Sequence, residues 1–180
     1  MSKQTFLTAA KGAALALPLL FASSVVTSNA ATAQAVGETV SAADPQGIAA
    51  ALRLAGYTAK ITTDGRGDPM IETKFGGWNG KVVFYGCDSE TNDGCDSVLL
   101  TTGFNRASPM SAEMVNQLVS RKRFASIRLD NEGDPFIEWD IVLSEPIPTG
   151  VFLRAVQLYS SSLDDIADTV FAEERAADGG

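Results

Sequence analysis

Two short motifs in this sequence bring an aspartate and a glutamate close together along the chain. The first holds Asp68 and Glu72, and the second holds Asp134 and Glu138. Two carboxyl groups about 5–10 Å apart are nearly all that a glycosidase needs for its acid–base chemistry. In both motifs, however, the aspartate falls in an expected turn and the glutamate on the solvent face of an expected strand. A structural role is therefore the stronger interpretation, and carboxylate-based hydrolysis is kept as an alternative.

A second oxygen-rich set lies between and beside the two cysteines, Cys87 and Cys95. Its acidic members form a weak candidate cation loop, and they are Asp88, Glu90, Asp93 and Asp96. Counted from Asp88, the glycine stands at the seventh place, whereas a calcium-binding EF-hand needs it at the sixth and a glutamate at the twelfth. A solvated acidic loop is the stronger interpretation, and we expect no bound metal.

The cysteines themselves are expected to form a structural disulfide. They are close in sequence, and an oxidising compartment favours their pairing. The closed loop of nine residues would contribute about 2.5 kcal/mol on the chain-entropy model. A redox or metal pair does not fit, because the sequence has no C-x-x-C, no third cysteine and no histidine.

Two further features are candidates for binding a partner. Arg121, Lys122 and Arg123 follow one another at the end of an expected helix, where cations favour the helix dipole and stay solvated or meet an acidic partner. Trp78 stands in a glycine-rich turn, where it either anchors an interface or folds back onto its own hairpin. Both alternatives stay open for each feature.

The residue types that are missing limit the chemistry further. Without histidine there is no Ser-His-Asp triad, no Cys-His pair and no usual zinc site. No phosphate-binding loop and no G-x-G-x-x-G motif occurs, so we predict no catalytic residue and no cofactor. The formal net charge of −8 disfavours nucleic acid and anionic lipid as partners.

The first 33 residues resemble a secretory signal. Lys3 and Lys11 are the only charges before Glu38, an apolar run follows them, and Ala31-Thr32-Ala33 is a candidate cleavage site. The apolar run is short for a bilayer and contains Pro18, so cleavage is favoured over a retained anchor. We expect a protein of the periplasm or outside the cell, not attached to the membrane, with a net charge of about −10 once both lysines are removed.

Hydrophobic periodicity predicts alternating helices and hairpins. The expected helices span residues 44–55, 111–123 and 151–172, and Asp44-Pro45 supplies an N-cap and a first-turn proline. The expected strands span residues 57–63, 70–75, 81–87, 97–104, 125–130 and 136–143. Residues 34–43 are expected to be a flexible leader, 44–172 a single domain, and 173–180 a disordered polar tail.

The best organising feature is an internal repeat, D-x-x-G-D-P-x-I-E, with an offset of 66 residues. Its turn residues are Asp64, Gly67, Asp68 and Pro69 in the first copy and Asp130, Gly133, Asp134 and Pro135 in the second. Each copy is predicted to be a helix followed by a β-hairpin, with Arg128 opposite Glu138 in the second. Because one face of the hairpin is apolar and the other charged, we expect an α+β fold: an antiparallel sheet of about six strands, with helices on one face.

Several local motifs resemble the YbjN family, which is assigned to bacterial sensory transduction regulation. They are Tyr57-Thr58-Ala59-Lys60-Ile61, the Gly-Asp-Pro turn with Ile71 and Glu72, Phe84-Tyr85-Gly86-Cys87, and Arg121-Lys122-Arg123-Phe124 leading to Leu129-Asp130. The resemblance covers residues 45–171. It implies a fold like that of type III secretion chaperones, often dimeric, and it carries over no catalytic residue.

Together these observations favour an exported, non-enzymatic adaptor or chaperone-like domain that binds a protein partner, with a homodimer as one form of that binding. A small-ligand or cation sensor is the second hypothesis. A carboxylate-based hydrolase is the third.

Overall fold

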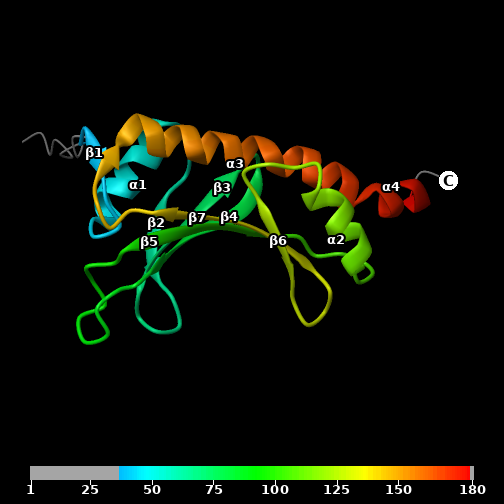
Figure 1. The fold of residues 1–180 in the computed structure, drawn as a ribbon, viewed down its shortest axis with the longest axis horizontal. Helices are drawn as coiled ribbons and strands as arrows, with labels where there is room; N and C mark the ends of the chain where they lie inside the picture. The colour runs from blue at the N-terminus through cyan, green and yellow to red at the C-terminus, as the bar shows by residue number, and fades with distance from the viewer. Residues whose placement is uncertain (1–36, 179–180) are drawn as a thin grey trace, which may run out of the picture. The chain divides into compact units, whose positions relative to one another are not determined.

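The computed structural model describes residues 37–178, and Figure 1 shows their arrangement. The expected signal segment, residues 1–33, and the first part of the expected leader lie outside the described residues. None of the helices within residues 37–178 combines the length and the apolar character needed to cross a bilayer.

The centre of the fold is a six-stranded antiparallel sheet, in which the strand order is β2-β3-β4-β5-β7-β6. The strands are β2 (Lys60–Thr63), β3 (Pro69–Phe75), β4 (Trp78–Tyr85), β5 (Ser97–Gly103), β6 (Ser126–Leu129) and β7 (Pro135–Val142). The prediction of an α+β fold with an antiparallel sheet of about six strands is confirmed.

Helices cover one face of this sheet. The long helix α3 (Thr149–Val170) runs across the sheet and α1 (Pro45–Leu54) lies beside it on the same side (Figure 1). The shorter helices α2 (Ala112–Val119) and α4 (Ala172–Asp178) lie near β6 and beyond the end of α3. The core forms where alternate strand residues meet α3, and its largest members include Ile71, Phe75, Phe84, Leu100, Ile137, Phe152, Tyr159 and Leu163.

Two of the three expected helices, α1 and α2, begin at a side chain that caps the first turn. The Asp44 carboxylate accepts a hydrogen bond from Gly47 N at 2.9 Å and caps α1, as the sequence predicts. Ser111 Oγ caps α2 by accepting from Met114 N at 3.2 Å. Helix α2 ends at Val119 rather than at Arg123, because Arg121 N and Lys122 N both donate to Leu118 O and turn the chain away.

The two copies of the sequence repeat form hairpins with the same register. Ile61 pairs with Ile71 in β2–β3, and Ile127 pairs with Ile137 in β6–β7. In the first turn, Asp64 Oδ1 accepts hydrogen bonds from Arg66 N and Asp68 N at 2.8 and 3.0 Å. In the second, Asp130 Oδ1 accepts from Glu132 N and Asp134 N at 3.0 and 2.8 Å. The first aspartate of each motif therefore holds its turn together.

The glycine of each turn has a positive φ, 99° at Gly67 and 83° at Gly133. A side chain is disfavoured in this region of the backbone. At Gly133 there is also no room for one, because an added Cβ would lie 2.6 Å from Pro109 Cβ. Both the backbone and the packing therefore require glycine here.

The predicted pairing of Arg128 with Glu138 is wrong in register. The turn includes Asp130, so Arg128 lies opposite Phe136, and Glu138 lies opposite Ser126. Arg128 Nη2 still reaches Glu138 Oε1 at 3.0 Å along the diagonal. The ion pair forms because a long side chain spans diagonal neighbours on one face of a sheet.

Both ends of the domain differ from the expected flexible leader and disordered tail. The strand β1 (Thr39–Val40) pairs with β8 (Ile147–Pro148), and Val40 and Ala42 are buried. Thr149 Oγ1 and N donate to Gly37 O and Glu38 O at 2.7 and 2.9 Å. At the other end, residues up to Asp178 form α4. Neither element was expected from the sequence, because contacts with residues far away along the chain hold both in place.

A buried tyrosine joins α3 to two central strands. The Tyr159 hydroxyl donates to Ile137 O at 2.8 Å and lies 3.1 Å from Thr102 Oγ1, and its ring meets Phe75 edge to face at 5.1 Å. Burial raises the pKa of the Tyr159 phenol well above its ordinary value, and nearby Glu138 adds to the shift.

We predict that Asp130→Ala lowers the free energy of unfolding by about 1–2 kcal/mol, because two backbone N–H groups lose their acceptor. Asp130→Asn is the matched control, since its amide oxygen can still accept both bonds. Urea unfolding of the two variants measures the difference. Equal losses in both would show that the side-chain acceptor does not stabilise the turn.

We predict that Tyr159→Phe costs about 1–2 kcal/mol at neutral pH, because it leaves Ile137 O without its donor. Tyr85→Phe, at an exposed tyrosine, is the control and should cost almost nothing.

The Tyr159 contribution should also depend on pH. The folded-state pKa is raised, so the stabilisation is complete below the unfolded-state pKa of about 10 and is lost as the pH rises above it. Urea unfolding from pH 8 to pH 11 should therefore show the stability of the wild type falling towards that of Tyr159→Phe. A constant difference over this range would contradict the assignment.

Candidate functional site: the open face of the sheet

The face of the sheet opposite α1 and α3 is not covered by any helix or strand within residues 37–178 (Figure 1). The sheet curves, and three connecting loops project on this side: the two repeat turns and the disulfide loop. The exposed surface is therefore a curved sheet face with loops at its margins. We call it the open face, and we define it by the strand residues that alternate with those of the core.

One row of the open face crosses all six strands with directly opposed residues. The row runs Lys60, Glu72, Lys81, Thr101, Glu138 and Ser126. Lys60 Nζ lies 3.1 Å from Glu72 Oε2, so the first two strands are joined by an exposed ion pair. Alternating charges of this kind contribute little stability but define an electrostatic pattern that a partner can match.

The middle of the next row of the open face is apolar, and the row ends at Thr62 on β2 and at Asp140 on β7. Met70, Val83 and Leu99 lie directly opposite one another on β3, β4 and β5, and each is half-buried. Beyond them, Tyr85 and Val142 are 45% and 73% exposed. Exposed apolar side chains that adjoin one another on a sheet are more informative than scattered ones, because they form a continuous surface that can be removed from water.

A hollow of about 370 Å³ lies at the other end of the same face. Its lining includes Glu72, Asn79, Lys81, Thr101, Gly103 and Phe136. Gly103 opens this space, since a Cβ there would lie 3.0 Å from Phe136 Cε1. The Arg128 guanidinium lies over the Phe136 ring, 4.6 Å from its centroid. The hollow therefore has an aromatic wall, and its rim carries charges of both signs.

The glutamates of this face are not arranged for acid–base catalysis. Glu72 and Glu138 lie on β3 and β7 with two strands between them, which separates them by about 14 Å. That exceeds the separation of about 5–10 Å that glycosidases use. Within each motif the aspartate and the glutamate are four residues apart along an extended chain, about 13 Å. Asp134 Oδ1 is also engaged, because it accepts a hydrogen bond from Arg106 N at 2.9 Å.

Cys87 and Cys95 form a disulfide, as the sequence predicts. Inside the loop, Asp88 Oδ1 accepts hydrogen bonds from Glu90 N and Thr91 N at 2.8 and 3.1 Å, and it lies 3.1 Å from Thr91 Oγ1, whose hydroxyl it shares with Asp93. These donors, the Glu90 N–H first, lower the pKa of the Asp88 carboxyl.

The weak candidate cation loop finds no support in this geometry. Asp88 directs an oxygen to the loop's own donors, and Asp93 Oδ1 accepts from Thr91 Oγ1. Among residues 37–178, no three acidic, histidine or cysteine side chains lie close enough together to hold a metal ion. The carboxylates that are hydrogen-bonded here stabilise the loop itself.

Trp78 is partly buried and packs against its own domain. It opens β4, its ring stacks on Phe171 at 5.9 Å, and it meets Phe104 at 4.8 Å. Its Nε1 donates to Asp164 Oδ1 on α3 at 3.3 Å. Of the two interpretations of this residue, the structure favours the one in which it folds back onto its own domain, and we do not retain it as a partner anchor.

The cations Arg121, Lys122 and Arg123 lie in the turn after α2 and not in its last helical turn. Lys122 Nζ pairs with Asp165 Oδ2 on α3 at 3.2 Å, and the Arg123 guanidinium lies 4.9 Å from the centroid of the Phe124 ring. Arg121 is exposed. A small hollow of about 180 Å³ between α2 and α3 is lined by Met114, Leu118, Arg121, Lys122 and their neighbours.

One polar site carries no signal in the sequence. Arg106 lies in the loop between β5 and α2, and only 1% of its side chain is exposed. No periodic pattern marks a loop arginine for burial, so sequence reasoning passed over it. Its proximity to Asp134 in space could have been expected only from knowledge that β5 pairs with β7.

The comparisons with known proteins agree with the resemblance drawn from the local motifs. No curated protein matches the sequence. A family model matches residues 44–172, which include every strand of the six-stranded sheet, and its description is "putative bacterial sensory transduction regulator". Since the match covers well over half of the chain, the protein belongs to the YbjN family.

Proposed function

We propose that the protein is an exported, non-enzymatic member of the YbjN family that acts as a protein-binding adaptor, or as a chaperone-like domain, in the cell envelope. The observation that carries the proposal is the open face. It offers a short apolar stretch on β3, β4 and β5, bordered by a row of charged and polar side chains. Both lie on the side of the sheet that α1 and α3 leave uncovered.

The apolar row supports a macromolecular partner. Met70, Val83 and Leu99 form an apolar stretch over three neighbouring strands, and exposed Tyr85 follows Val83 on the same face of β4. Val142 on β7 is exposed too, but Ser97 lies between it and Tyr85. Interfaces draw most of their affinity from a central apolar or aromatic cluster from which water is excluded. The charged row beside it would act as the polar rim, and it would fix the orientation of the partner more than its affinity.

The family description supports a regulatory setting but states no molecular activity. A regulator without catalytic residues acts through binding. The resemblance to type III secretion chaperones supports the same class of function, because those proteins act by holding other proteins. A second copy of this chain is one candidate occupant of the open face, and an envelope protein is the other.

The sequence of residues 1–33 supports export, because it combines basic residues, an apolar run and a small-residue cleavage site in the order of a secretory signal. The disulfide between Cys87 and Cys95 is consistent with an oxidising compartment. A cytoplasmic role in transcription or in kinase signalling does not fit with export.

A small-ligand sensor is the second candidate function, and the hollow at Gly103 favours it. Its volume of about 370 Å³ lies in the range of small-molecule sites, and it combines an aromatic wall with polar groups. Gly103→Val would fill this space. If the protein is a ligand sensor, this variant should lose ligand-dependent thermal stabilisation while Val142→Lys, outside the hollow, keeps it.

We predict that Tyr85→Asp with Val142→Lys abolishes capture of a partner by the open face. Both side chains are exposed, so the charges should weaken binding without disturbing the core. The matched control is Leu54→Lys with Val151→Glu, which replaces side chains that are 70% and 57% exposed but lie on α1 and α3. The measurement is a crosslinked pull-down from an envelope fraction with tagged mature protein.

The expected result is a protein that the wild type and the control enrich and that the open-face variant does not. Recovery of only the protein itself, lost in the open-face variant, would assign the face to a homodimer. Equal enrichment by all three proteins would show that the open face is not the docking surface.

We also predict that the protein is recovered from the periplasm or the medium with Gln34 as its first residue, because cleavage is expected after Ala33. Intact-mass measurement of the purified protein locates the amino terminus. Recovery from the cytoplasm with residues 1–33 still attached would contradict the export part of the proposal.

A further inference from the structure

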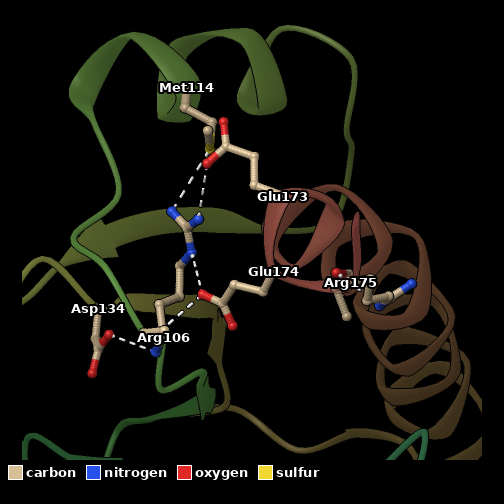
Figure 2. Close-up of polar contacts among 8 residues, drawn as sticks. Arg106, Met114, Asp134, Glu173, Glu174 and Arg175 are labelled. Atoms are coloured by element: carbon tan, nitrogen blue, oxygen red, sulfur yellow. Dashed lines mark hydrogen bonds and ion pairs between the residues drawn. The ribbon is translucent and has the colours of Figure 1, made fainter. Parts of the chain in front are cut away.

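A second polar site lies away from the open face, around the buried Arg106. Its guanidinium is enclosed by α2 and α4, and only 1% of the side chain is exposed (Figure 2). The backbone of Arg106 is held in place as well, because its N–H donates to Asp134 Oδ1 in the second repeat turn at 2.9 Å. A charge this deeply buried needs close partners, since removing an unpaired charge from water costs several kcal/mol.

Helix α4 supplies those partners. Glu173 Oε2 lies 3.5 Å from Arg106 Nη2, and Glu174 Oε1 lies 3.4 Å from Arg106 Nε. Glu174 Oε1 also accepts a hydrogen bond from Ala107 N at 2.9 Å. Figure 2 shows the two glutamates directed towards the guanidinium, while Arg175 points away from it.

The fit between the arginine and these carboxylates is incomplete. Nε and Nη2 make ion pairs by distance, but neither N–H has hydrogen-bond geometry to any acceptor among the described residues. Nη1 donates only to Met114 Sδ, at 3.9 Å. Arginine often binds a carboxylate through two parallel hydrogen bonds. The two glutamates of α4 therefore leave part of the hydrogen-bonding capacity of the Arg106 guanidinium unused.

Helix α4 is also held by few other contacts. Of its residues whose burial is described, none is a buried apolar side chain, and Ala172, Ala176 and Ala177 are exposed. The aromatic contacts of this region end at Phe171, which packs on Trp78 and Phe104 just before α4 begins. A helix of seven residues is not stable by itself. The acidic pair on Arg106 and Ala107 N therefore holds α4 in place from one side. On the other side Arg175 donates to Asp168 Oδ1 and Ala167 O of α3 at 2.8 and 3.2 Å. Phe171 is the point at which α4 can turn away.

A small hollow lies next to this site along α2. Met114 contacts Arg106 and also lines the hollow between α2 and α3, whose lining includes Arg121 and Lys122. Two further cations therefore lie near Arg106, in a protein whose net charge is −8. Such a surface is complementary to an acidic segment and not to a basic one.

We propose that Arg106 and Ala107 N form a binding site for two neighbouring carboxylates, which α4 fills in the free protein and an acidic helical segment of a partner protein occupies when that partner binds. The partner competes with α4 for Arg106 and Ala107 N, and the incomplete fit of Glu173 and Glu174 on the guanidinium makes α4 the weaker competitor. The site does not depend on the open face, so the two proposals can fail separately.

The test uses the full mature chain and a fluorescent peptide with the sequence of residues 167–178, which carries both glutamates. A second peptide has glutamine at both positions. The variant Glu173→Gln with Glu174→Gln weakens the internal competitor, so it should bind the diglutamate peptide about tenfold or more tightly than the wild type does. The diglutamine peptide should bind about tenfold or more weakly than the diglutamate peptide. Fluorescence anisotropy measures both.

Two further variants locate the site in the Glu173→Gln, Glu174→Gln background. Arg106→Gln should remove binding of the diglutamate peptide. Because this change could disturb folding, Arg121→Gln with Lys122→Gln gives an independent measurement on exposed or half-exposed residues and should weaken binding about threefold or more. Arg154→Gln changes an exposed arginine on α3 that does not line this hollow. It is the matched control and should bind like the Glu173→Gln, Glu174→Gln variant.

Failure of the diglutamate peptide to bind the Glu173→Gln, Glu174→Gln variant would overturn the proposal, and so would equal binding of both peptides. Analytical ultracentrifugation tests whether a second copy of this chain occupies the site. A wild-type dimer that is lost in Glu173→Gln, Glu174→Gln would mean that α4 exchanges between two copies, and it would overturn the assignment to a different protein.

Discussion

The packing of α3 across one face of the sheet is the contact on which the rest of the structure depends. Phe152, Val156, Tyr159, Leu163 and Ile166 enter the core from this one helix, and each is fully buried. Tyr159 adds direction to this apolar contact, because its hydroxyl must meet Ile137 O on β7. With the helices on one face, the alternation of strand residues leaves a complete second face outside the core. The open face is therefore a direct consequence of where α3 packs, and its composition is free to serve binding.

The sequence predicted those parts of the fold that depend on neighbouring residues. The repeated D-x-x-G-D-P motif determines two turns in which one aspartate oxygen accepts two backbone N–H groups, and such contacts need no distant element. The register of Arg128 was missed by two residues because Asp130 belongs to the turn and not to the strand. The order of the strands was beyond sequence reasoning, since the pairing of β5 with β7 joins segments on either side of α2.

The site residues were harder to predict for the same reason. The glycine-rich turn left it open whether Trp78 is exposed or folds back, because the rings that pack on it, Phe104 and Phe171, come from distant segments. Arg106 carried no signal and the acidic start of α4 was expected in a polar tail, and only their meeting in the folded chain forms an ion cluster around a buried guanidinium. The disulfide was predictable because its two cysteines are close in sequence and no competing ligand is present.

The two polar regions of the domain differ in how easily they can be rearranged. On the open face, the pair of Lys60 with Glu72 is exposed and the Arg128 end of its pair with Glu138 is half exposed, so water already solvates most of these charges and a partner that borders them meets little resistance. Around Arg106 the charge is buried beneath α4, and moving α4 would return the guanidinium to water as the ion pairs break. Hydration then offsets much of the lost attraction, which is why a buried charge covered only by a short terminal helix resists opening less than one enclosed by the core. Helix α4 is therefore the part of this domain in which folding and binding compete most closely.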